Sequence, residues 1–451
     1  MREGADTICA VATPAGVGGL GIIRVSGPRV PEIARTLIGS LPAPRYAVLA
    51  DFADAQGATI DSGIALYFPA PRSFTGEHVL ELHGHGGIFV LQQLVQRVLN
   101  LGARAARPGE FSERAFLNDK LDLVQAEAIA DLIDSGSNAA ARAAQRSLQG
   151  VFSDQVHRLQ EELTALRVFV EAAIDFPDEE IDFLAESDVT QRVQLAETHV
   201  SDLLAGARQG RLLRDGIVLA IIGRPNAGKS SLLNALSGQD SAIVTDIPGT
   251  TRDVLREQID IDGIPVHVAD TAGIRETTDR IEAEGVRRAR QVLESADIVL
   301  LIRDASEVEE PETALSSEVP VGTQAIIVAN KIDLLPEETL RKRAEEDSAE
   351  QVWISAKTGQ GTEDLKRRIR QAVGAPEQVE GSFSARQRHV DALKRTAHHL
   401  FTGRDVMESR QAGELLAEEL RLAQQALGEI TGEMMPDDLL GEIFSSFCIG
   451  K

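Results

Sequence analysis

A loop able to bind phosphate groups is the clearest chemical feature of the sequence. Gly223, Gly228, Lys229 and Ser230 fit the spacing G-x-x-x-x-G-K-[ST]. Glycines leave backbone N–H groups open to phosphate oxygens, the Lys229 ammonium can reach the β- and γ-phosphates, and the Ser230 hydroxyl can bind Mg²⁺. A glycine-rich turn without a ligand is the alternative, but an apolar run precedes the loop and a helical pattern follows it, as the motif requires. The residues expected to contact a nucleotide here are Asn226, Ala227, Gly228, Lys229, Ser230 and Ser231.

Two later segments can bind the metal ion and the γ-phosphate. Thr251, in residues 248–253, is the second expected Mg²⁺ ligand. Asp270 follows an expected strand and can hold a metal-bound water, and the N–H of Gly273 can sense the γ-phosphate. The residues of this region expected to contact the nucleotide are Thr245, Asp246, Ile247, Pro248, Gly249, Thr250, Thr251, Asp270, Thr271, Ala272 and Gly273.

Asp333 indicates which base the nucleotide carries. Its carboxylate can accept two N–H bonds from N1 and N2 of guanine, which adenine does not offer, and charge-assisted bonds of about 1.5–3 kcal/mol each make the discrimination large. Residues 355–357 can support the base through backbone N–H groups. The base-contacting residues are expected to be Asn330, Lys331, Asp333, Ser355, Ala356 and Lys357. Five motifs in this order predict a GTP-binding domain that uses Mg²⁺.

Hydrolysis requires a group that Ras-like GTPases do not use, because Ile274 stands where they have a water-orienting Gln. The phosphate loop, with Asn226, resembles that of the potassium-dependent GTPases. This resemblance implies a K⁺ ion bound by Asn226, Thr245, Ile247 and Thr250. On loop chemistry alone, Asn226 is also explained as a structural turn residue.

A carboxylate in residues 275–285 could act on the attacking water through a second water molecule. The spacing does not choose among the three candidates, which are Glu276, Glu282 and Glu284.

The segment that carries these motifs has the pattern of an α/β domain. Short apolar strands alternate with helical stretches over residues 216–375, which predicts βαβ units around a mainly parallel sheet. Asp262-Gly263 separates two apolar runs and predicts a hairpin, so one edge strand is expected to be antiparallel. The expected strands cover residues 217–222, 255–261, 264–269, 298–302, 325–329 and 351–354. We therefore expect a P-loop G domain with a Ras-like mixed sheet.

The flanking segments differ from the G domain and from one another. Residues 1–118 combine strand-like runs with a helical pattern, which predicts an α+β domain. Residues 119–215 and 376–451 are both helical, so we expect one discontinuous all-α domain into which the G domain is inserted. Apolar residues recur at spacings of three and four from Leu148 to Val170 and predict one long helix that ends before Pro177.

Composition limits the classes of protein that remain. The 451 residues carry a net charge of −24, which argues against a protein that coats nucleic acid but leaves a local basic patch open. We expect no membrane span and no signal peptide, and hence a soluble protein of the cytoplasm. Only Cys9 and Cys448 occur, so no disulfide framework is expected. His83 and His85 are two possible metal ligands without a third.

Motifs outside the G domain resemble those of the MnmE family, also called TrmE, whose members are tRNA uridine-modification GTPases. They are Asp6-Thr7-Ile8, the glycine-rich residues 13–21, residues 24–27, 81–87 and 108–118, and the terminal Cys448-Ile449-Gly450-Lys451. The resemblance covers the whole chain in domain order, and we find no departure at the motif positions.

The resemblance implies further properties. The N-terminal domain would bind a tetrahydrofolate derivative, 5-formyl or 5,10-methylene, and form a homodimer. The matching positions are Arg24, Glu81, Lys120 and Lys451. Without the family, Arg24 and Glu81 are more simply explained as solvated charges at strand ends. The family also points to Glu282 among the three glutamates.

The same resemblance implies the reaction and the partners. Together with the FAD-binding partner MnmG, members of the family install an aminomethyl-type group, such as carboxymethylaminomethyl, on C5 of the wobble uridine of certain tRNAs. Cys448 is important for that modification in a role that the sequence does not reveal. The alternative is a regulatory GTPase in ribosome assembly, against which stand the N-terminal domain, the terminal Cys448 and the absence of a recognisable RNA-binding module.

Overall fold

The structure is a computed structural model. It describes residues 6–175, 188–237, 255–270, 293–294, 296–307, 319–320, 323–336, 338, 351–375, 381–410, 412–433, 437–448 and 450. The chain folds as two compact units. The first combines Met1–Ala130, Leu148–Glu197 and Arg395–Lys451, and the second combines Asp131–Ser147 and Thr198–Lys394.

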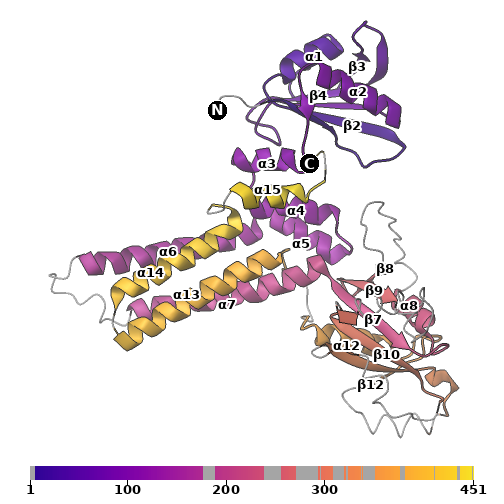
Figure 1. Cartoon of the computed structure of the whole chain (residues 1–451), viewed down its shortest axis with the longest axis vertical. Helices are drawn as coiled ribbons and strands as arrows, with labels where there is room; N and C mark the ends of the chain where they lie inside the picture. The colour runs from indigo at the N-terminus through magenta and orange to yellow at the C-terminus, as the bar shows by residue number, and fades with distance from the viewer. Residues whose placement is uncertain are drawn as a thin grey trace, which may run out of the picture. The chain divides into compact units, whose positions relative to one another are not determined.

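The N-terminal part of the first unit is built on a six-stranded sheet. Its strands are β1 (Ile8–Val11), β2 (Gly18–Ser26), β3 (Val48–Ala53), β4 (Thr59–Phe68), β5 (Val79–Gly86) and β6 (Arg104–Ala105). Their order is β3-β4-β5-β2-β1-β6, and only the β1–β6 pair is parallel. With three accompanying helices, α1 (Val30–Ile38), α2 (Ile88–Asn100) and α3 (Glu110–Leu117), this is the α+β arrangement predicted for residues 1–118 (Figure 1).

The two faces of this sheet pack against different helices. Side chains alternate along a strand, so Cys9 joins the core formed with α1 and α2, whereas Ile8 and Ala10 pack against Phe111 of α3. Arg24 of β2 lies opposite Ala10 on β1 and opposite Glu81 on β5. The face on which α3 packs therefore also carries the Arg24–Glu81 pair.

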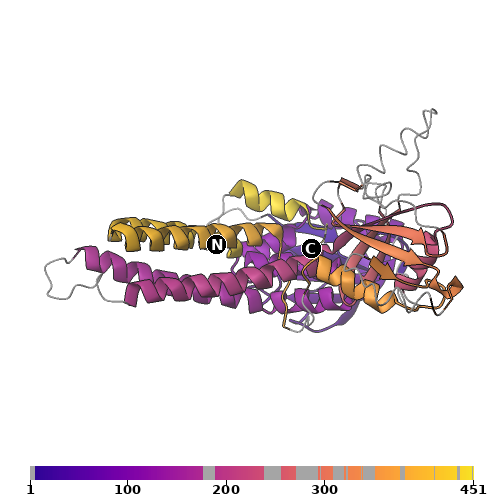
Figure 2. The same ribbon diagram turned by 90° about the horizontal axis from the view of Figure 1, so that it is seen from below.

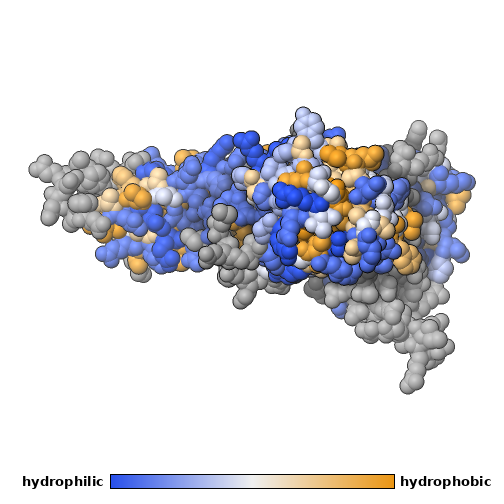
Figure 3. Space-filling view, turned by 90° about the horizontal axis from the view of Figure 1, so that it is seen from above, coloured by the Kyte–Doolittle hydropathy of each residue, from blue (hydrophilic) through white to orange (hydrophobic). Residues whose placement is uncertain are grey.

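Exposed large apolar side chains are frequent on the N-terminal domain, and orange surface gathers there in the space-filling view (Figure 3). Leu49 on β3 lies directly opposite Ile64 on β4, and their exposed fractions are 80% and 42%. The other exposed apolar or aromatic residues of this domain include Val17, Leu20, Tyr46, Ile88 and Phe89. We call Leu49 and Ile64, which lie on the face of the sheet opposite to α1 and α2, the apolar patch.

The helical regions are α4 (Leu123–Ile133), α5 (Asn138–Leu148), α6 (Val151–Asp175), α7 (Asp188–Asp215), α13 (Gln387–Arg410), α14 (Gly413–Thr431) and α15 (Asp437–Ser445). In the first unit, α14 lies along α6 (Figures 1 and 2). The apolar stripe predicted on α6 is buried from Phe152 to Val170. The prediction that this helix begins at Leu148 is wrong, because Leu148 ends α5 and Gly150, with φ +90°, separates the two helices. No described helix is long and apolar enough to cross a membrane.

The second unit contains the predicted mixed sheet. The strands are β7 (Ile217–Gly223), β8 (Leu255–Ile261), β9 (Ile264–Asp270), β10 (Ile298–Asp304), β11 (Gln324–Asn330) and β12 (Gln351–Trp353), in the order β12-β11-β10-β7-β9-β8. All pairs are parallel except β8–β9, so the hairpin predicted at Asp262-Gly263 is confirmed. The buried sheet packs against α8 (Lys229–Ser237) and α12 (Thr362–Ala372).

A buried carboxylate joins three distant segments of the second unit. Asp131 accepts hydrogen bonds from Nε of Arg214 at 2.8 Å, Nη2 of Arg386 at 2.7 Å and Oγ of Ser384 at 2.8 Å. Arg214 comes just before β7, and Ser384 and Arg386 come just before α13. The segments that lead into and out of the G domain are therefore tied to the same side chain of α4.

Candidate functional site

The phosphate loop connects the buried strand β7 to α8. Asn226 and Gly228 have φ angles of +66° and +97°, so the loop curls through the left-handed region that favours glycine and asparagine. A Cβ at Gly228 would lie 2.2 Å from Nδ2 of Asn330, so a side chain at position 228 would displace Asn330. The Lys229 ammonium donates hydrogen bonds to the carbonyls of Gly223 at 2.7 Å and Arg224 at 3.2 Å. These contacts hold the ammonium over the loop, where a phosphate chain would bind.

The hydroxyl-bearing residues after Lys229 begin α8. Ser230 and Ser231 are both exposed in the first helical turn, where the backbone N–H groups lack intrahelical partners. A hydroxyl and backbone N–H groups fit the oxygen-rich environment of a Mg²⁺–phosphate complex.

Asn330 connects the phosphate loop to the loop expected to contact the base. It is 2% exposed at the end of β11 and donates from Nδ2 to the carbonyl of Ala227 at 2.9 Å. Its Oδ1 accepts the backbone N–H of Ala356 at 3.0 Å. This side chain thus fixes the phosphate loop relative to residues 355–357.

Asp333 and Ser355 form the next part of the site. Oγ of the fully buried Ser355 donates to Oδ1 of Asp333 at 2.7 Å and accepts the N–H of Thr358 at 3.2 Å. Asp333 itself is exposed, as is Lys357. The carboxylate of Asp333 is therefore oriented by Ser355 while it stays accessible to a base.

Lys331 adopts φ +68° and pairs through Nζ with Oδ2 of Asp304 at 2.6 Å, at the end of β10. Burial favours the neutral acid, but hydrogen bonds from Lys331 and Ser306 outweigh it and lower the pKa of Asp304 below its ordinary value. The aliphatic part of Lys331 is thereby held in one place at the carboxyl edge of the sheet, where ligands bind in open α/β folds.

The structure brings together the predicted residues of the phosphate loop and of the base loops. Asp270 ends β9 in register with Ile221 of β7, which places its backbone beside the phosphate loop. The other predicted GTP, Mg²⁺, K⁺ and catalytic positions of this region lie outside the described residues: Thr245, Asp246, Ile247, Pro248, Gly249, Thr250, Thr251, Thr271, Ala272, Gly273 and Glu282.

A second group of charged residues lies on the N-terminal sheet. Nη2 of Arg24 contacts Oε1 of Glu81 at 2.9 Å across the β2–β5 pair, and both side chains are about four-fifths buried, with 22% and 17% exposed. The Arg24 guanidinium lies 5.4 Å from the ring centre of Phe74 and 5.8 Å from that of Phe111. This is a partly enclosed cation and carboxylate with aromatic walls.

Sequence reasoning missed three members of this second group. His83 contacts Oε2 of Glu81 at 3.3 Å through Nε2, and Phe74 and Phe111 flank Arg24. His83 lies two residues from Glu81 on one strand, so the period of two could have placed it on the same face. Nothing local in the sequence indicates the two phenylalanines, which come from a loop and from α3. No group of three potential metal ligands occurs among the described residues.

Of the other predicted folate positions, Lys120 is exposed and lies beside the Gly76 turn, and Lys451 is outside the described residues. Cys448 is exposed, and its carbonyl accepts the N–H of Gly109 at 3.3 Å. The tail then reaches the end of β1, where a Cβ at Gly450 would lie 2.4 Å from the carbonyl of Val11. By contrast, burial raises the pKa of the Cys9 thiol to about 11.

Two family models match the chain. One described as the MnmE helical domain matches residues 123–448, and one described as the GTP-binding protein TrmE N-terminus matches residues 7–120. The chain is 55% identical over 447 residues to the tRNA modification GTPase MnmE of Hydrogenovibrio crunogenus, with 99% of each chain covered. It is 56% identical over 456 residues to the protein of the same name from Stutzerimonas stutzeri, with both chains fully covered. Among solved structures, Era of Aquifex aeolicus bound to GDP and aluminium fluoride matches with 30% identity and a TM-score of 0.28, covering 41% of this chain and 66% of that one.

Proposed function

Because the chain belongs to the MnmE family of tRNA modification GTPases, we propose that it hydrolyses GTP to drive the modification of C5 of the wobble uridine, position 34, in certain tRNAs. The group added is carboxymethylaminomethyl or aminomethyl, and the reaction is shared with the FAD-dependent partner MnmG, which alone carries the FAD. The observation that carries the proposal is the joint presence of a G-domain site and of an exposed Cys448 tail on the N-terminal domain. We propose that both partners work in the cytoplasm.

The G-domain site supports GTP as the nucleotide. The Lys229 ammonium, now on two carbonyl acceptors, would pair with β- and γ-phosphate oxygens. Ser230 with Thr251 would hold Mg²⁺, which would neutralise charge on the phosphates. Asp333, oriented by Ser355, accepts the N1 and N2 hydrogens of guanine.

Hydrolysis depends on K⁺ in this proposal. Asn226, at the exposed crest of the phosphate loop, would bind the ion together with Thr245, Ile247 and Thr250, and Glu282 would act on the attacking water. The rate of GTP hydrolysis should be roughly tenfold or more higher in KCl than in NaCl of equal ionic strength. Equal rates in the two salts would remove K⁺ from the mechanism. Replacing Asn226 with Ala should abolish the difference between the salts.

The N-terminal group of residues would bind a tetrahydrofolate derivative, 5-formyl or 5,10-methylene, as the one-carbon source. A carboxylate such as Glu81 can accept N–H bonds from a pterin ring, an aromatic wall can stack on it, and cations such as Arg24, Lys120 and Lys451 can pair with a glutamate tail. Isothermal titration calorimetry of the full chain with 5-formyltetrahydrofolate measures the binding and tests this assignment.

We also propose that the chain is a homodimer through its N-terminal domain. The apolar patch, formed by Leu49 and Ile64, is the kind of surface that a second copy covers. The double substitution of Leu49 and Ile64 by Asp should halve the mass seen in sedimentation equilibrium. An unchanged mass would place the interface elsewhere.

The decisive experiment is mass spectrometry of tRNA nucleosides from cells that lack the gene. We expect C5-aminomethyl wobble uridines to disappear, and to return with the wild-type chain but not with Cys448→Ser. If these nucleosides persist, the alternative of a regulatory GTPase in ribosome assembly gains support, and ribosome profiles of the same cells should then show unassembled subunits.

A further inference from the structure

The first turn of α3 contacts both the C-terminal segment and the N-terminal sheet. The N–H of Gly109 bonds to the Cys448 carbonyl, and a Cβ at Gly109 would lie 2.3 Å from the carbonyl of Phe444. Two residues later, Phe111 packs on Ile8 and Ala10 and lies under Arg24. A shift of this turn would therefore move the Cys448 segment relative to the Arg24–Glu81 pair.

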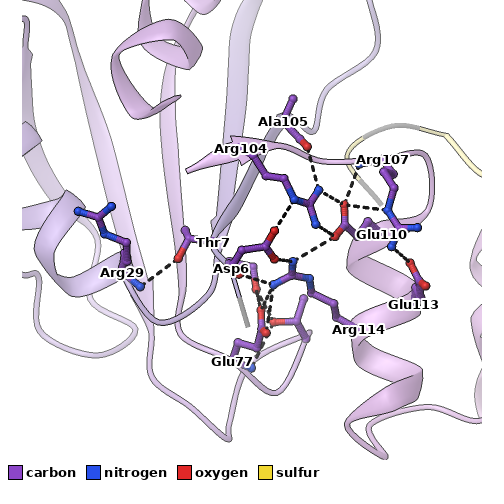
Figure 4. A network of polar contacts seen from close by, with 12 residues as sticks. Asp6, Thr7, Arg29, Glu77, Arg104, Ala105, Arg107, Glu110, Glu113 and Arg114 are labelled. Atoms are coloured by element: carbon purple, nitrogen blue, oxygen red, sulfur yellow. Dashed lines mark hydrogen bonds and ion pairs between the residues drawn. The ribbon is translucent and has the colours of Figure 1, made fainter. Parts of the chain in front are cut away.

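Glu110 holds this turn from inside. Its carboxylate is 2% exposed and accepts the backbone N–H of Arg107 at 2.8 Å, Nη1 of Arg104 at 2.8 Å and Nη2 of Arg114 at 3.0 Å (Figure 4). Arg114 continues the network to Asp6 at 2.7 Å and to Glu77 at 3.1 Å. The turn that presents Gly109 is thus tied to β6 and to the start of β1.

The charged cluster does more than attach α3 to the domain. Apolar contacts already do this, since Phe111 packs on β1 and Phe116 lies 6.1 Å from Phe444 between ring centres. A buried ion cluster stabilises a fold no better than well-packed apolar side chains of the same volume, but it fixes geometry. The bond from the backbone of Arg107 to Glu110 fixes the residues just before Gly109.

We propose that Glu110, held between Arg104 and Arg114, is a positioning residue that keeps the Cys448 segment docked against the start of α3 and the end of β1. Glu110 acts through Gly109, whose N–H holds the Cys448 carbonyl, and touches no reacting atom. The inference rests on the proposed function in one respect, which is that Cys448 takes part in tRNA modification.

Hydrogen exchange of the full chain, followed by mass spectrometry, tests the positioning role. In Glu110→Gln, Arg104 and Arg114 lose the buried one of their anionic partners. We expect peptides covering residues 440–450 to exchange about tenfold faster, as the loss of about 1.4 kcal/mol of local stability would give. The matched control is Glu113→Gln on the same helix, since Glu113 pairs with the exposed Arg107 at 2.9 Å, and its loss leaves the hydrogen bonds of Glu110 to Arg104, Arg114 and the Arg107 backbone in place. The Arg107 guanidinium contacts Glu110 only at the longer distance of 3.6 Å. Exchange in the control should equal that of the wild type.

A second variant displaces the tail without altering the charges. Gly109→Ala places a methyl group against the Phe444 carbonyl and strains a position with φ +65°. It should reproduce the faster exchange of residues 440–450. Both variants should keep GTP hydrolysis, and the hydrogen exchange of β2 and β5, near wild-type values, which shows that the domains remain folded, while wobble-uridine modification in cells falls at least tenfold.

Three results would overturn the inference. They are unchanged exchange of residues 440–450 in both variants, faster exchange with undiminished modification, or faster exchange that spreads to β2 and β5 in both Glu110→Gln and Gly109→Ala. None of these would affect the proposed function, which fails only if the gene deletion leaves the modified uridines in place or if Cys448→Ser restores them.

Discussion

The G domain and the N-terminal sheet hold their functional cations in opposite ways. Lys229 is held by two neutral backbone carbonyls on a loop, whereas Arg24 is held by a carboxylate across a strand pair. A charged phosphate chain readily replaces neutral carbonyls as the partner of the Lys229 ammonium. Little of the binding free energy is therefore lost in breaking the contacts that Lys229 already makes. At the sheet, a ligand anion must compete with Glu81 for Arg24. The difference predicts that removing the cation from the phosphate loop lowers GTP hydrolysis more than removing a charge from the sheet lowers tetrahydrofolate binding.

The largest expected effect is at the loop. Lys229→Ala removes a cation that stabilises charge developing on the phosphates, so single-turnover GTP hydrolysis should fall about 10²–10³-fold. Tetrahydrofolate binding, measured on the same sample, should not change. If hydrolysis survives or folate binding falls as well, the two regions do not act as separate sites.

The next effect concerns the choice of base. Asp333→Asn replaces two charge-assisted bonds, so GTP affinity should fall about 100-fold while xanthosine triphosphate binds better. Asp364→Asn is the control, because Asp364 is an exposed residue of α12 that pairs with Arg367, one turn along the same helix. Competition with a fluorescent GTP analogue measures both. A loss of GTP affinity without a gain for the xanthine nucleotide would point to a folding defect.

A smaller effect is expected at the sheet. Glu81→Gln keeps the shape of the side chain but removes the charge that would accept N–H bonds from the pterin ring, so 5-formyltetrahydrofolate should bind about tenfold more weakly. GTP hydrolysis should stay unchanged, and Glu32→Gln, an exposed partner of Arg29, should affect neither. Tighter folate binding in Glu81→Gln would mean that Glu81 only competes for Arg24 and does not bind the ligand.

The smallest expected effect is the pH dependence of the stability that the charged Glu110 contributes to the fold. Burial favours the neutral form of Glu110, but hydrogen bonds from Arg104, Arg107 and Arg114 lower its pKa from 4.5 to about 2. Its stabilisation is therefore complete above pH 4.5 and is lost as the pH falls from there towards about 2, because the unfolded chain takes up the proton first.

Urea unfolding measures that contribution. Since Arg104 is partly exposed, we expect Glu110→Gln to lower the free energy of unfolding by only about 1 kcal/mol at pH 7, and less at pH 3. A difference that grows on acidification would contradict the assignment.

The two regions also differ in how far the sequence alone predicts them. The residues of the phosphate loop lie within one short motif. The base loops follow buried parallel strands whose carboxyl ends lie at the same edge of the sheet, so Asn330, Asp333 and Ser355 could be placed together. The group around Arg24 draws on β2, β5, α3 and a loop, and spacing along the chain does not encode such distances. The sequence predicts Arg24 and Glu81 only through a family resemblance, and it does not predict Phe74, His83 and Phe111 as members of this group.

Helix boundaries show the same limit on a local scale. The apolar period continued from Leu148 into α6, and only the backbone angle of Gly150 breaks it. A glycine within a periodic pattern is compatible with a helix as well as with its end, so the break depends on tertiary contacts.

The buried Asp131 cluster suggests how a nucleotide domain could be accommodated inside another fold. Arg214, Ser384 and Arg386 all lie outside residues 216–375, so every member of the cluster remains when that stretch is deleted. The two segments that flank the G domain are held together by these polar contacts with Asp131 and do not depend on the inserted sequence to bring them together. A helical domain held in this way could accept one inserted domain in place of another. If a short linker joined Arg214 directly to Ser384, the contacts of Asp131 with both residues should persist.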